Sequence, residues 1–166
     1  MPYSRDYGKN ITKDWFDKRT DIKTIVDLGA GSGTYPKLLG NKYIWKAVEI
    51  WAPYIKRFGL DKLYKEIRIG DIQYMELPDG DCAILGDCLE HLNKESAIKT
   101  FIKVDSQFKH VIISIPIALL SHRNFEGNEF ESHLSTWTWE ELNNLVPLTY
   151  KIRKQTEPYK LAIFIK

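Results

Sequence analysis

The fold is decided by residues 25–34, which read Ile25-Val26-Asp27-Leu28-Gly29-Ala30-Gly31-Ser32-Gly33-Thr34. An apolar, β-branched run ends in an acid, and three alternating glycines then lead into a segment compatible with a helix. Glycine adopts positive φ readily and lets backbone approach a ligand, while the first turn of a helix offers amide donors without intrahelical partners. The stretch therefore predicts a strand, a ligand-binding turn and a helix, in that order.

This turn departs from the one that binds dinucleotides. A dinucleotide turn follows the pattern G-x-G-x-x-G or G-x-G-x-x-A, and Thr34 occupies its third position here. Asp27 also lies two residues before the first glycine, where a carboxylate suits an ammonium group better than a pyrophosphate. Both features count against a nicotinamide-dependent dehydrogenase, which we keep as an alternative.

Short apolar runs recur along the chain in alternation with segments compatible with helices. The runs are nearly continuous, as in strands of a parallel sheet that is covered on both faces. We expect strands at 24–28, 43–50, 64–69, 82–85 and 111–115, and helices at 35–39, 53–58 and 94–107. Alternation of this kind predicts an α/β fold wound with right-handed crossovers.

Two segments lie outside this alternation. Residues 1–22 carry Trp15 and Phe16 among charges, which indicates an N-terminal helical segment. Residues 116–135 show no periodicity and are long for a connection in a small domain, so we expect a substrate-side loop there.

The end of the chain indicates a different kind of pairing. Thr138 and Glu141 have the spacing of a capping box, so a helix should begin there. The runs at 148–154 and 159–165 flank Glu157-Pro158 and are typical of an antiparallel hairpin. Residues 1–166 are thus expected to form a single domain, a three-layer α/β/α sandwich whose seven-stranded, mostly parallel sheet ends in an antiparallel hairpin.

Acids follow the first four predicted strands. Glu49 comes 22 residues after Asp27, Asp71 comes 22 residues after Glu49, and Asp87 ends the fourth strand. The carboxyl ends of parallel strands face one crevice, which is where ligands bind in such sheets. The sequence therefore predicts that four carboxylates converge on one site.

Together, the glycine turn and the spaced acids resemble the class I, Rossmann-like S-adenosylmethionine-dependent methyltransferases of the small, single-domain type. The resemblance implies S-adenosyl-L-methionine as cofactor. Its methionine part would contact Asp27 and the glycine turn, its ribose Glu49, and its adenine Ile50, Asp71 and Ile72. Asp87 opens Asp87-Cys88-Leu89-Glu90-His91-Leu92, which is similar to the family's fourth motif. The cofactor residues implied are Asp27, Gly29, Ala30, Gly31, Gly33, Glu49, Ile50, Asp71, Ile72 and Asp87.

The methyl acceptor is less constrained. His122 and His133 are the candidate general bases, whereas His91 is expected to pack or cap at the start of the following helix. We expect transfer to an oxygen or nitrogen of a small molecule. Methylation of RNA or protein by a module acting with a partner, and a protein that binds the cofactor without catalysis, remain the alternatives.

Composition excludes some classes of protein and predicts the charge around the site. The chain has 166 residues, 43% of them hydrophobic and 28% charged, as in globular proteins. Only two cysteines occur, too few for a disulfide scaffold or a zinc cage, so we predict no metal site and a cytoplasmic location. Six acids and no lysine or arginine lie between residues 71 and 90, so the cofactor mouth should be negative although the net charge is +2. We expect no membrane association, and a monomer or homodimer.

Overall fold

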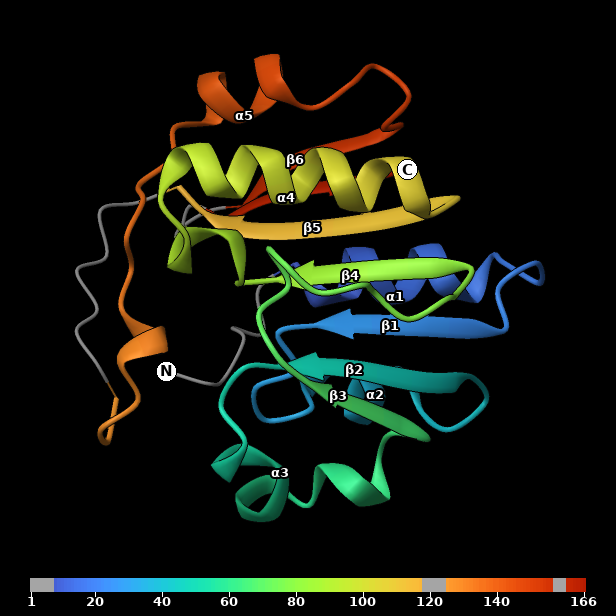
Figure 1. Cartoon of the computed structure of the whole chain (residues 1–166). Coiled ribbons are helices and arrows are strands. Elements are labelled where there is room, and N and C mark those ends of the chain that lie inside the picture. The colour runs from blue at the N-terminus through green and yellow to red at the C-terminus, as the bar shows by residue number, and fades with distance from the viewer. Residues whose placement is uncertain (1–7, 118–124, 157–160) are drawn as a thin grey trace.

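The computed structural model describes residues 8–117, 125–156 and 161–166. Seven strands form one sheet in the order β3-β2-β1-β4-β5-β7-β6 (Figure 1). The strands are β1 (Thr24–Leu28), β2 (Ile44–Glu49), β3 (Glu66–Ile69), β4 (Cys82–Gly86), β5 (His110–Pro116), β6 (Ile152–Thr156) and β7 (Leu161–Ile165). The first five are parallel to one another, and β7 runs antiparallel to both β5 and β6. The predicted seven-stranded mixed sheet is confirmed.

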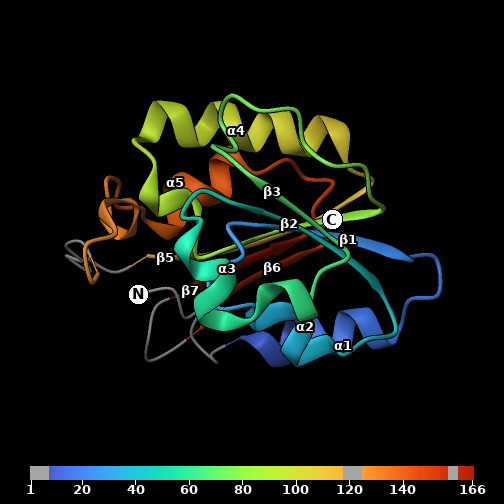
Figure 2. The same cartoon turned by 60° about the horizontal axis from the view of Figure 1, so that its bottom comes forward.

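Helices cover both faces of the sheet, as Figure 2 shows. On one face lie α4 (Lys94–Gln107) and α5 (Trp139–Leu145); on the other lie α1 (Lys9–Asp17), α2 (Thr34–Leu39) and α3 (Pro53–Phe58). Three short 3₁₀ turns connect them: η1 (Leu60–Lys62), η2 (Leu89–His91) and η3 (Glu129–Glu131). The α4 bounds are those expected from the sequence, and the predicted capping box of Thr138 and Glu141 begins α5.

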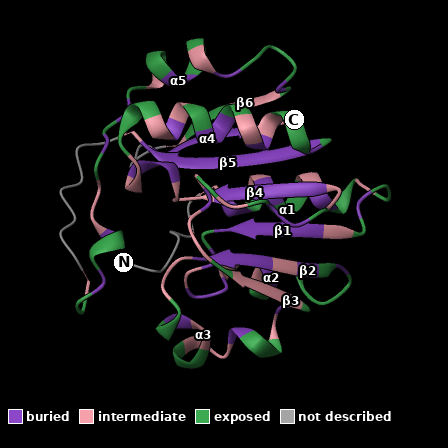
Figure 3. Cartoon of the chain, viewed as in Figure 1, coloured by how far each residue is buried: buried purple, intermediate pink, exposed green. Residues whose placement is uncertain are grey.

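Each face of the sheet has its own apolar core. Phe101 and Val104 of α4 pack with Trp137 against one face, while Phe16 of α1 and Tyr35 of α2 pack against the other. The central strands β1, β4, β5 and β7 are almost wholly buried, and exposure increases toward β3 and β6 (Figure 3). Burial on both faces explains why the strands are continuous apolar runs rather than alternating ones.

The segment boundaries differ from expectation in several places. In the described part of the 1–22 segment, which begins at residue 8, the helix occupies residues 9–17. The last strand pair begins at Ile152 rather than residue 148, because Leu148 is 86% exposed and follows the end of α5. Tyr64 precedes β3 instead of beginning it, and its ring is buried beneath the sheet's edge.

The predicted loop 116–135 is described in part. Strand β5 extends through Pro116, residues 118–124 are not described, and residues 125–135 contain η3. In Figure 1 residues 125–135 pass beyond the tips of the parallel strands.

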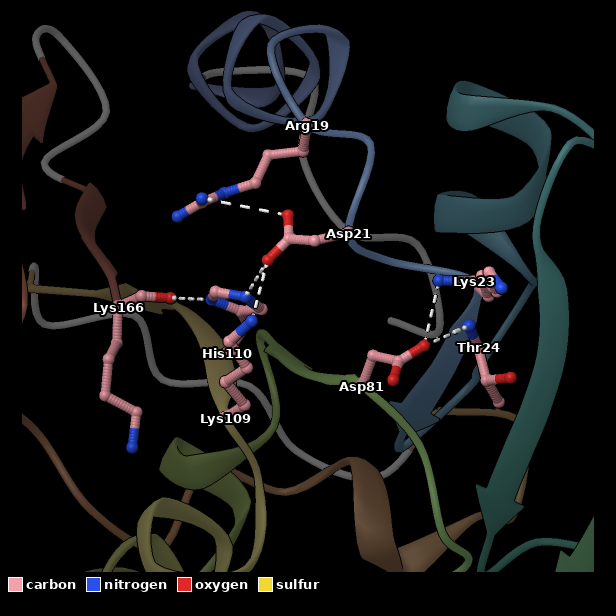
Figure 4. Close-up of polar contacts among 8 residues, drawn as sticks. All are labelled: Arg19, Asp21, Lys23, Thr24, Asp81, Lys109, His110 and Lys166. Atoms are coloured by element: carbon pink, nitrogen blue, oxygen red, sulfur yellow. Dashed lines mark hydrogen bonds and ion pairs between the residues drawn. The ribbon is translucent and has the colours of Figure 1, made fainter.

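A polar cluster lies at the amino ends of the parallel strands (Figure 4). The Asp21 carboxylate contacts Lys109 Nζ at 2.9 Å and His110 Nε2 at 3.0 Å, and these two contacts hold the pKa of Asp21 well below its usual range. Asp81 accepts hydrogen bonds from the amides of Lys23 and Thr24 at 2.8 and 2.9 Å. These contacts join the starts of β1, β4 and β5, far from the carboxyl ends that form the site.

Within the described residues, no helix is both long and apolar enough to cross a lipid bilayer.

Candidate functional site

A cavity of about 270 Å³ lies at the carboxyl ends of the parallel strands. All four acids that follow the predicted strands reach it, as the parallel arrangement requires. Nine of the ten residues implied as cofactor contacts line it: Asp27, Gly29, Ala30, Gly31, Glu49, Ile50, Asp71, Ile72 and Asp87.

The tenth residue, Gly33, has another position. It precedes α2 with φ 72°, and a Cβ atom there would lie 2.6 Å from Leu63 Cδ1, on the side of α3 and η1. Gly29 and Gly31 also have positive φ, 81° and 51°, and they do line the cavity. Gly33 therefore shapes the turn, while Gly29 and Gly31 expose backbone to the cavity.

Asp27 is the most deeply buried of these acids. The Tyr64 hydroxyl donates a hydrogen bond of 2.6 Å to its Oδ2 atom. Burial raises the pKa of Asp27 to about 7; the Tyr64 hydrogen bond opposes this rise and the nearby Glu49 carboxylate adds to it. Asp27 is thus a carboxyl group whose charge changes near neutral pH, and a cation beside it would favour its ionised form.

Glu49 connects β2 to the glycine turn. Its Oε2 accepts from the Gly31 amide and its Oε1 from the Trp51 amide, both at 2.8 Å. Burial raises the pKa of Glu49, whereas these amide donors lower it. Asp71 has a similar local arrangement, since it accepts from the backbone and side-chain amides of Gln73 at 2.8 and 3.0 Å. Both carboxylates are held in fixed orientations at the cavity wall.

Residues 125–135 close one side of the cavity against α3. The Tyr54 hydroxyl donates to Glu131 Oε1 at 2.9 Å, and Arg57 forms an ion pair with Glu126. The Phe130 ring lies 6.2 Å from the ring of Trp51. This segment therefore adds Phe130 and Glu131 to a cavity lining that also includes the strand ends and the start of α2.

A second group of polar side chains lies on η2 and the same segment. Glu90, His91 and His133 each offer a ligand atom within 4.8 Å of the others, and the two imidazole rings are 4.9 Å apart. Asn93, not His91, caps α4, so the capping role expected for His91 is wrong; His91 packs edge-on against His133 and also lines the cavity. The predicted base His133 belongs to this group, and His122 lies outside the described residues.

Burial controls the charge of this group. The pKa of Glu90 is raised well above its usual range by burial and by the nearby Asp87 carboxylate, and burial lowers the pKa of His91. Sequence reasoning missed Tyr64, Glu131 and Glu90 as members of the site. The only sequence signal for Glu90 was its place in the fourth motif, while Tyr64 contacts Asp27 and Glu131 contacts Tyr54 across long distances in sequence.

Comparison with known proteins supports the fold. No protein-family model and no curated protein sequence matches the chain. Among solved structures, an S-adenosylmethionine-dependent methyltransferase from Clostridium acetobutylicum superposes with a TM-score of 0.70 at 14% identity, over 95% of this chain and 88% of that one. The N-terminal domain of EvdMO1 with SAH bound gives 0.67 at 12% identity, over 98% and 80%.

Two further structures widen the range of activities on this fold. The small RNA methyltransferase HEN1 gives a TM-score of 0.69 at 19% identity, over 99% of this chain but 26% of that one. A putative zinc-dependent alcohol dehydrogenase from Rhodobacter sphaeroides gives 0.74 at 10% identity, over 98% and 89%. The chain also spans only 55% of an O-methyltransferase family protein from Burkholderia thailandensis. At these identities the likeness establishes the fold alone. The reaction has to be argued from the residues of the site.

Proposed function

We propose that this chain, which has the fold of the class I S-adenosylmethionine-dependent methyltransferases, uses that cofactor to methylate an oxygen or nitrogen of a small molecule. One observation carries the proposal. Five carboxylates line the cavity, from Asp27, Glu49, Asp71, Asp87 and Glu131, and no lysine or arginine is among its described lining residues.

The residues present fit this cofactor. S-Adenosylmethionine carries a sulfonium and an ammonium group, which a cavity lined by carboxylates favours. Backbone exposed at Gly29 and Gly31 allows the close approach that a bound amino acid moiety needs. Glu49 and Asp71 are oriented by backbone amides and suit the ribose hydroxyls and the adenine amino group. When bound, the cofactor supplies an electrophilic methyl group.

The chain's own residues then contribute position and the exclusion of water. Methyl transfer is an in-line displacement, so holding the two reacting atoms in line provides much of the rate enhancement. Ile72 and Cys88 line the cavity beside the strand ends, and segment 125–135 covers part of its remaining side.

The acids beside the glycine turn and the strand order argue against a nicotinamide cofactor, which the similarity to the dehydrogenase would otherwise suggest. A pyrophosphate carries negative charge and binds where a helix start or basic groups are free of nearby acids. Here Asp27 and Glu49 flank the glycine turn, and Glu49 already occupies the Gly31 amide. The sheet also inserts β7 antiparallel between β5 and β6, unlike the parallel 3-2-1-4-5-6 order of dinucleotide-binding folds.

The proposed acceptor is a small molecule with an apolar face. Phe130 is 41% and Leu134 64% exposed, and both line the cavity, so they form an apolar rim on its open side. The carboxylates behind the rim would repel a polyanion, so RNA methylation, the activity named for the HEN1 neighbour, would need a partner that binds the RNA. A partner-dependent RNA or protein methyltransferase is thus the second candidate.

Calorimetric titration with S-adenosylmethionine and S-adenosylhomocysteine tests the cofactor. We expect saturable binding of both, weakened at least tenfold in Glu49→Gln. The matched control is Glu66→Gln, which removes a carboxylate of β3 that pairs with Lys46 and Arg68. Absence of binding at millimolar cofactor would refute the proposal.

Release of S-adenosylhomocysteine with a panel of hydroxyl and amine acceptors tests catalysis. Turnover with small acceptors supports the primary proposal. Turnover only with RNA or protein, together with retention of that partner in a gel shift or pull-down, supports the second candidate. Cofactor binding without turnover on any acceptor would leave a binding protein and refute both.

A further inference from the structure

We propose that Glu90, His91 and His133 bind one divalent transition-metal ion at the acceptor side of the cavity. The site itself stands on the geometry of these residues. Only the role assigned to the ion below, which is to bind an acceptor hydroxyl, rests on the proposed methyltransferase function.

The donor set suits such an ion. Two imidazole nitrogens and one carboxylate oxygen lie within 4.8 Å of one another. Zinc holds such ligands at about 2.0–2.2 Å, which places the ligand atoms roughly 3.3 Å apart in a tetrahedral site. Binding of the ion would therefore draw the ligand atoms together by up to about 1.5 Å. Mixed nitrogen and oxygen donors favour Zn²⁺, Co²⁺, Mn²⁺ or Fe²⁺ over Mg²⁺ or Ca²⁺, which prefer oxygen alone.

The Glu90 side chain is the second, independent sign of a ligand. Glu90 is only 1% exposed, and its Oε2 atom has no hydrogen-bond partner within the described residues. A buried carboxylate without a partner is costly, and each such group in a folded protein calls for an explanation. A metal ion between Glu90 and the two imidazoles would provide the missing partner.

Backbone contacts already orient the ligands. The Ser132 carbonyl lies 3.2 Å from His91 Nδ1, so that nitrogen is the protonated one and Nε2 keeps its lone pair. A backbone carbonyl on the second ring nitrogen is the usual support of a metal-binding histidine. The Glu90 carbonyl accepts from the amides of Leu134 and Ser135 at 2.9 and 3.1 Å, which fixes the segment carrying His133 against η2.

The position of the group indicates what the ion would do. Three protein ligands leave at least one coordination position for another molecule. His91 and Leu134 line the cavity, so this position borders the space assigned to the acceptor. An acceptor hydroxyl bound there would have a lowered pKa. In the transfer the oxygen–methyl bond forms as the sulfur–methyl bond breaks, the bonding pair stays on sulfur, and the hydroxyl proton passes to solvent.

Titration of the tag-free, metal-stripped chain with Co²⁺, followed by visible absorption and calorimetry, tests the site without any activity measurement. We expect one Co²⁺ per chain, competed by Zn²⁺, with a spectrum typical of nitrogen and oxygen ligands. Glu90→Gln and His133→Asn should each weaken binding at least 100-fold. Glu129→Gln, an exposed acid on η3, is the matched control and should not change it.

Circular dichroism melts and cofactor titration accompany each variant, so that loss of folding is distinguished from loss of a ligand. If Glu90→Gln does not fold, Co²⁺ binding by His133→Asn and the wild-type spectrum still show whether the metal site exists. No stoichiometric binding by the wild type, or equal binding by folded variants, would overturn the metal site. Cofactor binding without metal binding refutes the site alone, whereas metal binding without cofactor binding refutes the proposed function alone.

Discussion

Asp27 gives the sharpest prediction, because its pKa lies near 7 in the folded chain. If Asp27 contacts a cationic part of the cofactor, its ionised form should bind and its protonated form should not. With a pKa of about 7, about one-tenth of the Asp27 carboxyls are ionised at pH 6 and about nine-tenths at pH 8. The cofactor dissociation constant should therefore fall about tenfold over that range, and binding at pH 6 should release a proton.

Folding stability should change in the opposite sense. The pKa of Asp27 is raised from 3.8 to about 7 on folding, so the folded chain keeps a proton that the unfolded chain has lost. The stability that this proton contributes is complete below pH 4 and is lost as the pH rises through 7. The difference amounts to about 4 kcal/mol by the linkage relation, which is an upper figure for a buried group.

Calorimetry in buffers of different ionisation enthalpy measures both the affinity and the proton release. The control is Asp27→Asn, in which the Tyr64 hydroxyl can still donate to the side-chain carbonyl. Cofactor groups that titrate contribute equally to both proteins, so the difference between them isolates Asp27. We expect the variant to bind weakly and to lose the tenfold dependence. Equal pH slopes for wild type and Asp27→Asn would refute the reasoning, as would a cofactor-free stability difference that does not change between pH 5 and 8.

Three further substitutions follow from the structure. Tyr64→Phe removes the hydrogen bond that lowers the pKa of Asp27, so the midpoint of the pH-dependent affinity should move upward; an unmoved midpoint in the same titration would count against that contact. Gly86→Ala places a Cβ atom 2.3 Å from the Tyr35 ring and should reduce stability by about 1–3 kcal/mol in denaturant unfolding, so an unchanged midpoint would contradict the packing. Thr138→Ala removes half of the α5 capping box and should lower stability by about 1 kcal/mol, with Thr138→Ser restoring it; no loss in a thermal melt would show that the cap contributes little.

The sheet was predictable from the sequence because its signals are local. Buried parallel strands appear as continuous apolar runs, and the glycine turn fixed the position of the first crossover. The four acids could be assigned to one site since parallel strands present their ends at the same edge. The ends of the strands were less well defined: Leu148 is apolar yet exposed, so composition alone placed the start of β6 too early.

The acceptor side was less predictable, since it depends on contacts between distant segments. Tyr54 and Glu131 are 77 residues apart, and Tyr64 and Asp27 are 37 apart, at spacings that no periodicity relates. His133 was proposed as a base from its residue type, but its proximity to Glu90 required the tertiary structure. Glu90, His91 and His133 come from two segments about 40 residues apart, so the sequence alone did not indicate that they lie together.

The inserted position of β7 has a consequence for how the chain is made. Strand β7 lies between β5 and β6 and forms antiparallel ladders with both, so the pairing of this half of the sheet involves the last strand in sequence. On the ribosome, β1 to β5 can assemble early, but one edge of β5 stays open until residues 161–165 emerge. The growing chain therefore exposes an unpaired apolar strand edge between the synthesis of β5 and that of β7, which is the period when a chaperone would have most to protect.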